Sequence, residues 1–364
     1  MHSYVGVMSD HPEEYEVTVV GGGPAGLTAA LYTTRLGHDT AVINRGGGRA
    51  AMMLDTHNVI GVTEETSGNE FLATGVEQVQ SYGVDYHQDF VTDVERLDDG
   101  RFHLTAGNVE VVSEFVVFAT GFSDARPDPP LPRTGKGLHY CLHCDAYMFV
   151  DEPVYVMGHG EAAAHVAMIM LNFTPEVDLL LRGDEPTWSE ETDTQLRAHP
   201  IDVVDDDIES MEKDDDGWLE AFVFEDGTRR EYKGGFPMYG SEYNTDLAES
   251  IGVELNEDGT IAVDDHGRTN VEKVYAVGDV VPGHNQIPVA LGMGAKAGIG
   301  IHYDARTFPM SLEDIEARGG LSKEDVPAVS SRLEDIAVHH EGHAGGPRAD
   351  SDGDGEEEPA SADD

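Results

Sequence analysis

Two glycine-rich turns set the strongest limit on how this chain folds, because each lies between a predicted strand and a predicted helix. In the first copy, residues 16–20 predict a buried strand, 27–36 a helix and 40–43 a second strand. The second copy repeats this order, with a strand at 153–157 and a helix at 164–171 that a further strand follows. Strand, glycine-rich turn, helix and strand together form the βαβ unit typical of dinucleotide binding. The sequence therefore predicts an α/β protein with two such units.

The first turn carries glycines at the three positions that a pyrophosphate site needs. Gly21 permits the tight turn, Gly23 lets the pyrophosphate approach the backbone, and Gly26 allows the helix to pack close to the strand. Pro24 and Ala25 lie between them, where the positive end of the helix faces the phosphates. We expect all five residues to contact a dinucleotide.

The strand after this helix ends in Asn44, at the position that usually carries an acid for the adenosine ribose. An asparagine side chain still hydrogen-bonds a ribose hydroxyl, but more weakly than a carboxylate does. Asn44 is therefore predicted to contact the cofactor, with a weaker hydrogen bond to the ribose than an acid would make.

The chain has two cysteines, Cys141 and Cys144, and both fall in one CxxC motif. A dithiol at this spacing can close a small disulfide ring and exchange it with another disulfide. Two other interpretations stay open at this point. The flanking His139 and His143 would complete a zinc site with the thiolates, although four ligands so close in sequence crowd one another. The cysteines would otherwise be an inert buried pair.

Four segments in this order and spacing resemble the low-molecular-weight thioredoxin reductases. They are the turn at 21–27, the segment 119–121 after a buried strand, the CxxC segment 141–145, and residues 276–279. The resemblance covers roughly residues 15–307. It implies two three-layer ββα domains of the Rossmann type, the second inserted in the first.

The resemblance also implies where the domains begin and end. Residues 15–122 and 242–308 would form an FAD-binding domain in two pieces, and 123–241 an inserted NAD(P)-binding-like domain that carries the CxxC motif. A charged helical extension at 309–340 and an acidic disordered tail at 341–364 would follow.

Further site residues follow from the resemblance alone. Cys144 would be the sulfur that faces the flavin, Cys141 the outer sulfur that attacks the substrate, and Asp145 the general acid. Other residues would contact FAD: Asn58, Gly121, Gly278, Asp279, Gln286 and Ile287. For Asp279, the N-cap of the long helix that follows is an alternative role.

The second turn matches the family pattern less well. Gly158, Gly160 and Ala163 fit its GxGxxA, but the arginine cluster that binds the 2′-phosphate of NADPH is reduced to Arg182, and two acids follow it. Three donors stay open: NADPH bound through Arg182, NADH, or a donor that is not a nicotinamide. NADPH is the favoured expectation.

The balance of 71 acidic against 22 basic residues gives a formal net charge of −49. Such a surface repels phosphate backbones and anionic lipids, which argues against nucleic-acid and membrane partners. Because the acids spread along the whole chain, we expect a protein adapted to a salt-rich, halophile-type cytoplasm. No apolar run is long enough for a membrane span, and no metal site is predicted.

These features predict a thioredoxin reductase-like enzyme that passes electrons from a reduced donor through FAD and the Cys141–Cys144 pair to thioredoxin or a similar disulfide. The inserted domain would rotate about hinges near residues 124–132 and 239–244, and the family implies a homodimer. The alternatives are an FAD-dependent dithiol oxidase and a redox flavoprotein served by ferredoxin or another donor.

Overall fold

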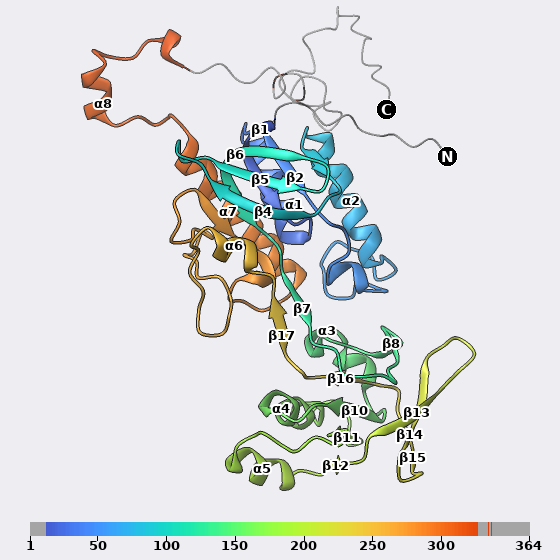
Figure 1. The fold of residues 1–364 in the computed structure, drawn as a ribbon. Coiled ribbons are helices and arrows are strands. Elements are labelled where there is room, and N and C mark those ends of the chain that lie inside the picture. Colours follow the sequence, from blue (N-terminus) through green and yellow to red (C-terminus); the bar gives the residue numbers. More distant parts are fainter. Residues whose placement is uncertain (1–11, 327–333, 335, 337–364) are drawn as a thin grey trace, which may run out of the picture.

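The computed structural model describes residues 12–326, 334 and 336, and its largest sheet has seven strands (Figure 1). Along the sheet the order is β3 (Asp85–His87), β2 (Thr40–Ile43), β1 (Glu13–Val20), β6 (Glu110–Phe118), β5 (Phe102–Ala106) and β4 (Val91–Arg96). The strand β18 (Val274–Ala276) pairs in parallel with the last part of β6. A strand from late in the sequence thus completes a sheet begun near the start.

Alternating side chains pack the two faces of this sheet against different layers. Val17 and Val19 of β1 lie in a core with the helices α1 (Pro24–Arg35), α2 (Gly68–Ser81) and α7 (Ile287–Ala305). Val20 faces the other way, into a core with β4, β5 and the short helix α6 (Asp246–Ser250). Since successive strand residues point to opposite faces, residues 17–20 of β1 are buried on both faces of the sheet.

The second sheet has six strands, all paired in parallel. Its order is β12 (Asp202–Val204), β11 (Val177–Leu180), β10 (Val154–Met157), β16 (Gly234–Pro237), β9 (Gly137–Leu138) and β8 (Arg133–Thr134). Val154 and Val156 of β10 face α4 (Glu161–Met170) and α5 (Glu190–Arg197). Tyr155 and Met157 face a three-stranded antiparallel sheet of β13 (Ile208–Lys213), β14 (Leu219–Phe224) and β15 (Arg229–Glu231).

A two-stranded ribbon joins these layered units. The strand β7 (Phe122–Asp124) leaves the first unit and pairs antiparallel with β17 (Ser241–Tyr243), which returns to it. Cys141 of the CxxC motif is the N-cap of α3 (Leu142–Asp145), and Cys144 lies on that helix. The short helix η2 (Ala146–Phe149) follows, and α3 lies at the end of the second unit next to the ribbon (Figure 1). The predicted α/β class, with one layered unit inserted in another, is confirmed.

Several boundaries differ from the sequence prediction. The helix α1 begins at Pro24 and α4 at Glu161, each three residues before the predicted start, because a helix can begin within the glycine-rich turn itself. Asp279 lies in the short helix η3 (Gly278–Val280), whereas the N-cap of α7 is Gln286. The alternative of Asp279 as the N-cap of the long helix is therefore wrong.

The predicted extension at 309–340 is described only in part. It contains α8 (Leu312–Ala317) and the short helix η4 (Lys323–Asp325). Most of 327–340 and the whole predicted tail at 341–364 lie outside the described residues.

Candidate functional site

A cavity of about 800 Å³ opens where the parallel strands of the first unit end. The first glycine-rich turn follows β1, Asn44 follows β2, and Gly121 lies shortly after β6. The carboxyl ends of parallel strands are where open α/β sheets bind their ligands. The cavity has the volume of a cofactor site.

The backbone of the first turn is shaped by its glycines. Gly21 has φ +111°, and a Cβ there would lie 2.3 Å from the carbonyl oxygen of Ala119. A Cβ on Gly26 would lie 2.0 Å from the carbonyl oxygen of Gly21, so only glycine allows this approach of helix and strand. Above Gly23 there is open space, with no atom of the described residues within 4 Å of a Cβ position. The start of α1 is thus open to an anionic group from the cavity.

At the rim of the cavity, Asn44 is oriented by a neighbouring strand. Its Nδ2 donates a hydrogen bond of 2.7 Å to the hydroxyl of Tyr86 on β3. The amide oxygen stays available as an acceptor for a ligand hydroxyl.

Deeper in the cavity, burial raises the pKa of Asp279, while the nearby guanidinium of Arg49 acts in the opposite direction. Arg49 Nε lies 2.9 Å from Asp124 Oδ2, and Nη2 donates a 3.0 Å bond to the carbonyl oxygen of Tyr140. Arg49 therefore connects the first unit to the ribbon and to the CxxC segment. Arg49 was not among the predicted site residues, although two arginines, Arg45 and Arg49, that flank three glycines in so acidic a chain are a detectable signal.

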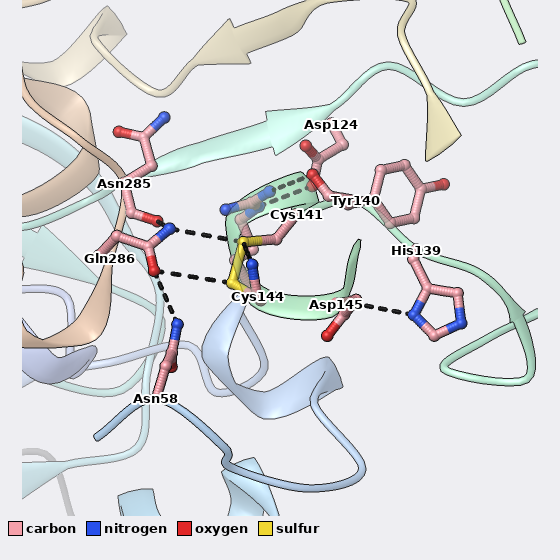
Figure 2. The surroundings of a disulfide bond; sticks show 10 residues. Asn58, Asp124, His139, Tyr140, Cys141, Cys144, Asp145, Asn285 and Gln286 are labelled. Atoms are coloured by element: carbon pink, nitrogen blue, oxygen red, sulfur yellow. Dashed lines mark hydrogen bonds and ion pairs between the residues drawn. A yellow bond between two sulfur atoms is a disulfide. The ribbon is translucent and has the colours of Figure 1, made fainter. Parts of the chain in front are cut away.

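The two cysteines form a disulfide on the wall of the same cavity. Figure 2 shows Gln286 facing both sulfurs: its Nε2 donates to Cys141 Sγ at 3.4 Å, and its Oε1 lies 3.7 Å from Cys144 Sγ. Asn58 Nδ2 donates a 2.9 Å bond to that Oε1. The structure thus brings Asn58, Gln286 and the sulfur pair together from three distant segments.

Asp145 lies on the same wall, beside the disulfide. One of its carboxylate oxygens lies 2.9 Å from Nδ1 of His139, whose ring is buried (Figure 2). His139 is therefore engaged with a carboxylate. No group of three or more histidine, cysteine or acidic side chains suited to a metal occurs within the part of the chain that the structure describes.

Residues 15–294 match the family described as pyridine nucleotide-disulphide oxidoreductase. The chain belongs to this family. It is 31% identical over 310 residues to a thioredoxin reductase of Peptoclostridium litorale, a match that covers 78% of this chain and 95% of that one. It is 30% identical over 297 residues to a component of the alkyl hydroperoxide reductase of Staphylococcus epidermidis, covering 79% of this chain but only 58% of that protein.

Its fold is also similar to a solved thioredoxin reductase from Streptococcus pyogenes, with a TM-score of 0.73 and 26% identity over 80% of this chain and 98% of that one. Membership of the pyridine nucleotide-disulphide oxidoreductase family confirms the predicted resemblance and the prediction of an FAD-dependent disulfide oxidoreductase. Among the described helices, none combines the length and the apolar character of a membrane span.

The second glycine-rich turn of this family member does not line the cavity. Its own chain folds onto it: Thr187 N donates to the carbonyl oxygen of His159 at 2.7 Å, and Ser189 N donates to Glu161 Oε1 at 2.6 Å. Hydrogen bonds from Ser189 and Thr192 hold the pKa of Glu161 below its usual value. An ionised carboxylate thus occupies the first turn of α4, where a pyrophosphate would approach.

Arg182 is also engaged. Its side chain is only 6% exposed, with Nε 2.8 Å from Asp207 Oδ1, and Nη1 donates to the carbonyl oxygen of Asp128. The following acid, Asp184, lies 3.2 Å from Nδ1 of His159. In this structure Arg182 therefore contacts the backbone at Asp128 and the carboxylate of Asp207 instead of an open nucleotide site.

Proposed function

We propose that this oxidoreductase is of the thioredoxin reductase type and reduces thioredoxin or a similar disulfide through Cys141 and Cys144. One observation carries the proposal: the redox-capable disulfide opens on the same cavity as the first glycine-rich turn. A bound flavin and the sulfur pair would then be neighbours. The match to the Peptoclostridium thioredoxin reductase over nearly its whole length supports thioredoxin as the partner class.

The proposed domains are those expected from the sequence. An FAD-binding domain would comprise 15–122 and 242–308, and an inserted domain 123–241. The positions of the two parallel sheets and the ribbon support this division. A charged extension at 309–340 and a tail at 341–364 complete the proposed organisation.

FAD would be held along the cavity from the first turn to the disulfide. Gly21, Gly23 and Gly26, with Pro24 and Ala25, would bind the pyrophosphate. The remaining contacts would come from Asn44, Asn58, Gly121, Gly278, Asp279, Gln286 and Ile287. All of these except Gly26 line the cavity, and Gly26 acts through the close packing of α1. FAD, when bound, supplies or accepts the electron pair.

The residues of this chain supply the sulfur chemistry. Cys144 would be the sulfur that exchanges electrons with the cofactor, and Cys141 the one that attacks the partner disulfide. Gln286 Nε2 donates a hydrogen bond to Cys141 Sγ, and its Oε1 lies beside Cys144 Sγ. Asp145 would give a proton to a departing thiolate.

For the electron donor we propose a nicotinamide dinucleotide at Gly158, Gly160 and Ala163, with NADPH as the donor implied by the family. Arg182 would be its 2′-phosphate contact. The fit is weaker than at the first turn, since Arg182 is bound to Asp207 and Asp128 and an acid begins α4. That observation favours a second candidate, in which NADH or another donor reduces the protein.

The ribbon of β7 and β17 supports hinges near residues 124–132 and 239–244, about which the inserted domain would turn. A homodimer and a cytoplasmic location belong to the same proposal. A chain whose two cysteines form one exchangeable pair fits a reducing compartment.

The test uses anaerobic stopped-flow mixing of the purified flavoprotein with NADPH, NADH and reduced ferredoxin in high salt. Rapid flavin reduction by either nicotinamide, followed by turnover of thioredoxin, is the expected result. Cys144→Ser should keep its flavin but lose disulfide turnover. A separate aerobic assay measures oxygen uptake with small dithiols, and uptake without thioredoxin turnover would identify a dithiol oxidase and overturn the proposal.

A further inference from the structure

A buried histidine lies behind the proposed acid Asp145. His139 follows β9, and its backbone N–H is fixed by a 2.9 Å hydrogen bond to the carbonyl oxygen of Gly235. The side chain is 4% exposed and packs against the rings of Phe149 and Phe236, at centroid distances of 5.2 and 6.3 Å. The imidazole therefore has little freedom to rotate.

The hydrogen bonds of this ring favour one arrangement of its proton. Nδ1 lies 2.9 Å from Asp145 Oδ2, whereas the buried Nε2 has no hydrogen-bond partner among the described residues. A proton on Nε2 would bury an N–H donor without an acceptor, which costs more than burying a bare lone pair. We therefore assign the proton to Nδ1, which donates to the carboxylate of Asp145.

We propose that His139 is a positioning residue: it holds one carboxylate oxygen of Asp145 and leaves the other to carry the proton needed at the sulfur pair. This inference rests on the proposed function. In Figure 2 the second oxygen of Asp145 points away from His139. Asp145 is 22% exposed on the cavity wall, so this oxygen can be protonated again after each cycle.

The step balances as a two-electron reduction. An electron pair from the reductant breaks the bond between Cys141 Sγ and Cys144 Sγ, one sulfur remains a thiolate, and the other takes the proton of Asp145. Solvent then returns a proton to the carboxylate. Without His139, the carboxyl group would rotate freely and present its proton less often.

Other groups that titrate near this pair must be separated from it in the test. Burial, followed by the charges of Glu64, Asp145 and Asp55, raises the pKa of Tyr147 on η2 above its usual 10, so this hydroxyl does not titrate between pH 5 and 9. On the side of His139, the packed rings of Phe149 and Phe236 carry no charge. The two sulfurs titrate once the disulfide is open.

The experiment measures how fast dithiothreitol opens the Cys141–Cys144 disulfide of the flavoprotein between pH 5 and 9. Dithiothreitol supplies both electrons, so the readout does not depend on the natural donor. His139→Phe, which suits the aromatic surroundings, should lower the rate about tenfold and displace its pH profile. His139→Asn keeps an N–H at the δ position and should recover most of the rate.

A double-mutant cycle with Asp145→Asn decides whether His139 acts through Asp145. His139→Phe should change the rate less than about twofold in the Asp145→Asn background. His38→Phe, at another buried histidine, is the matched control and should leave the profile unchanged. An equal loss in both backgrounds, or an unmoved pH profile for His139→Phe, would overturn the inference. Failure of the proposed function is separate, because Cys144→Ser would then retain thioredoxin turnover.

Discussion

The two glycine-rich turns share a topology but differ in what surrounds them. The first opens on a cavity, with free space above Gly23 and an accessible helix start. At the second, the segment after β11 folds back, so that Thr187 bonds to the turn and Glu161 accepts a hydrogen bond from Ser189. The βαβ unit alone therefore does not make a nucleotide site.

The difference arises in the loop after the second strand of each unit. In the first unit, this loop holds Gly46, Gly47 and Gly48, all with positive φ, and it lines the cavity together with the turn. In the second, the matching loop carries Asp184, which pairs with His159 of the turn itself. A loop of glycines leaves space for a ligand beside the turn. In the second unit, paired side chains occupy that space.

The largest expected effect comes from adding one methyl group to each turn. Gly26→Ala would place Cβ 2.0 Å from a carbonyl oxygen, so the helix must move off the strand. We expect loss of bound flavin and a fall of about 3 kcal/mol or more in the free energy of unfolding. The Cβ of Gly160→Ala would have Thr187 Oγ1, at 3.8 Å, as its nearest neighbour in the described part of the chain, so stability should change by less than about 0.5 kcal/mol.

Flavin absorbance per protein and urea unfolding measure both variants. A Gly26→Ala protein with full flavin content would contradict the assignment of the first turn. Loss of flavin from Gly160→Ala would reverse the roles of the two turns.

Local patterns predicted the units well, because strand and helix periodicity and the glycine positions are properties of short segments. The same reasoning found the CxxC pair, whose chemistry depends on a spacing of three residues. It placed the starts of α1 and α4 too late, since the turn residues themselves enter the helix. The halophile-type adaptation inferred from net charge stays a prediction.

Side-chain partners across the fold could not be predicted from the residues alone. Asn58 and Gln286 are 228 residues apart, and only resemblance to a family suggested that they meet near the sulfurs. Arg182 was visible as a lone arginine, but its pairing with Asp207 depends on how two strand ends meet. His139 was considered only as a zinc ligand, because nothing in the sequence indicates that its ring faces Asp145.

The next effect compares one arginine from each unit. Arg49→Met should lower the free energy of unfolding by about 2 kcal/mol, because it leaves Asp124, only 12% exposed, without its cation. Arg182→Met should cost about 1 kcal/mol, since its partner Asp207 is 41% exposed and can be solvated. Urea unfolding measures both, with Arg197→Met on the surface of α5 as a control. If both variants lost the same free energy of unfolding, the burial of the partner carboxylate would not explain the strength of these ion pairs.

A smaller effect concerns nicotinamide binding at the second turn. Glu161→Gln removes the negative charge from the start of α4 but keeps an oxygen that can accept from Ser189. We expect the Kd for both NADPH and NADH to fall about threefold to tenfold, because the two share the pyrophosphate. Titration calorimetry measures this, with Glu190→Gln at the start of α5 as the matched control. Unchanged binding of both nucleotides would indicate that the donor does not use this turn.

The smallest effect is a pH dependence of stability in the first unit. Burial, aided by His38 and Arg306, lowers the pKa of His302 on α7 below its usual 6.5. The folded state therefore binds this proton less readily than the unfolded state, so stability is full above pH 6.5 and falls as the pH drops below it. Because the side chain is only half-buried, the loss should be only about a few tenths of a kcal/mol.

His302→Asn keeps a donor toward His38 but cannot titrate, so urea unfolding at pH 7.5 and 5.5 should show a smaller difference than for the unmodified protein. The hydrogen bond from His38 lowers the pKa of Glu16, so the stability that this carboxylate contributes is full above its usual pKa of 4.5 and is lost only as the pH falls below that value. Between pH 5.5 and 7.5, a slope that His302→Asn leaves intact would therefore have to come from another histidine. That result would remove the titration of His302 on α7 as the origin of the pH dependence.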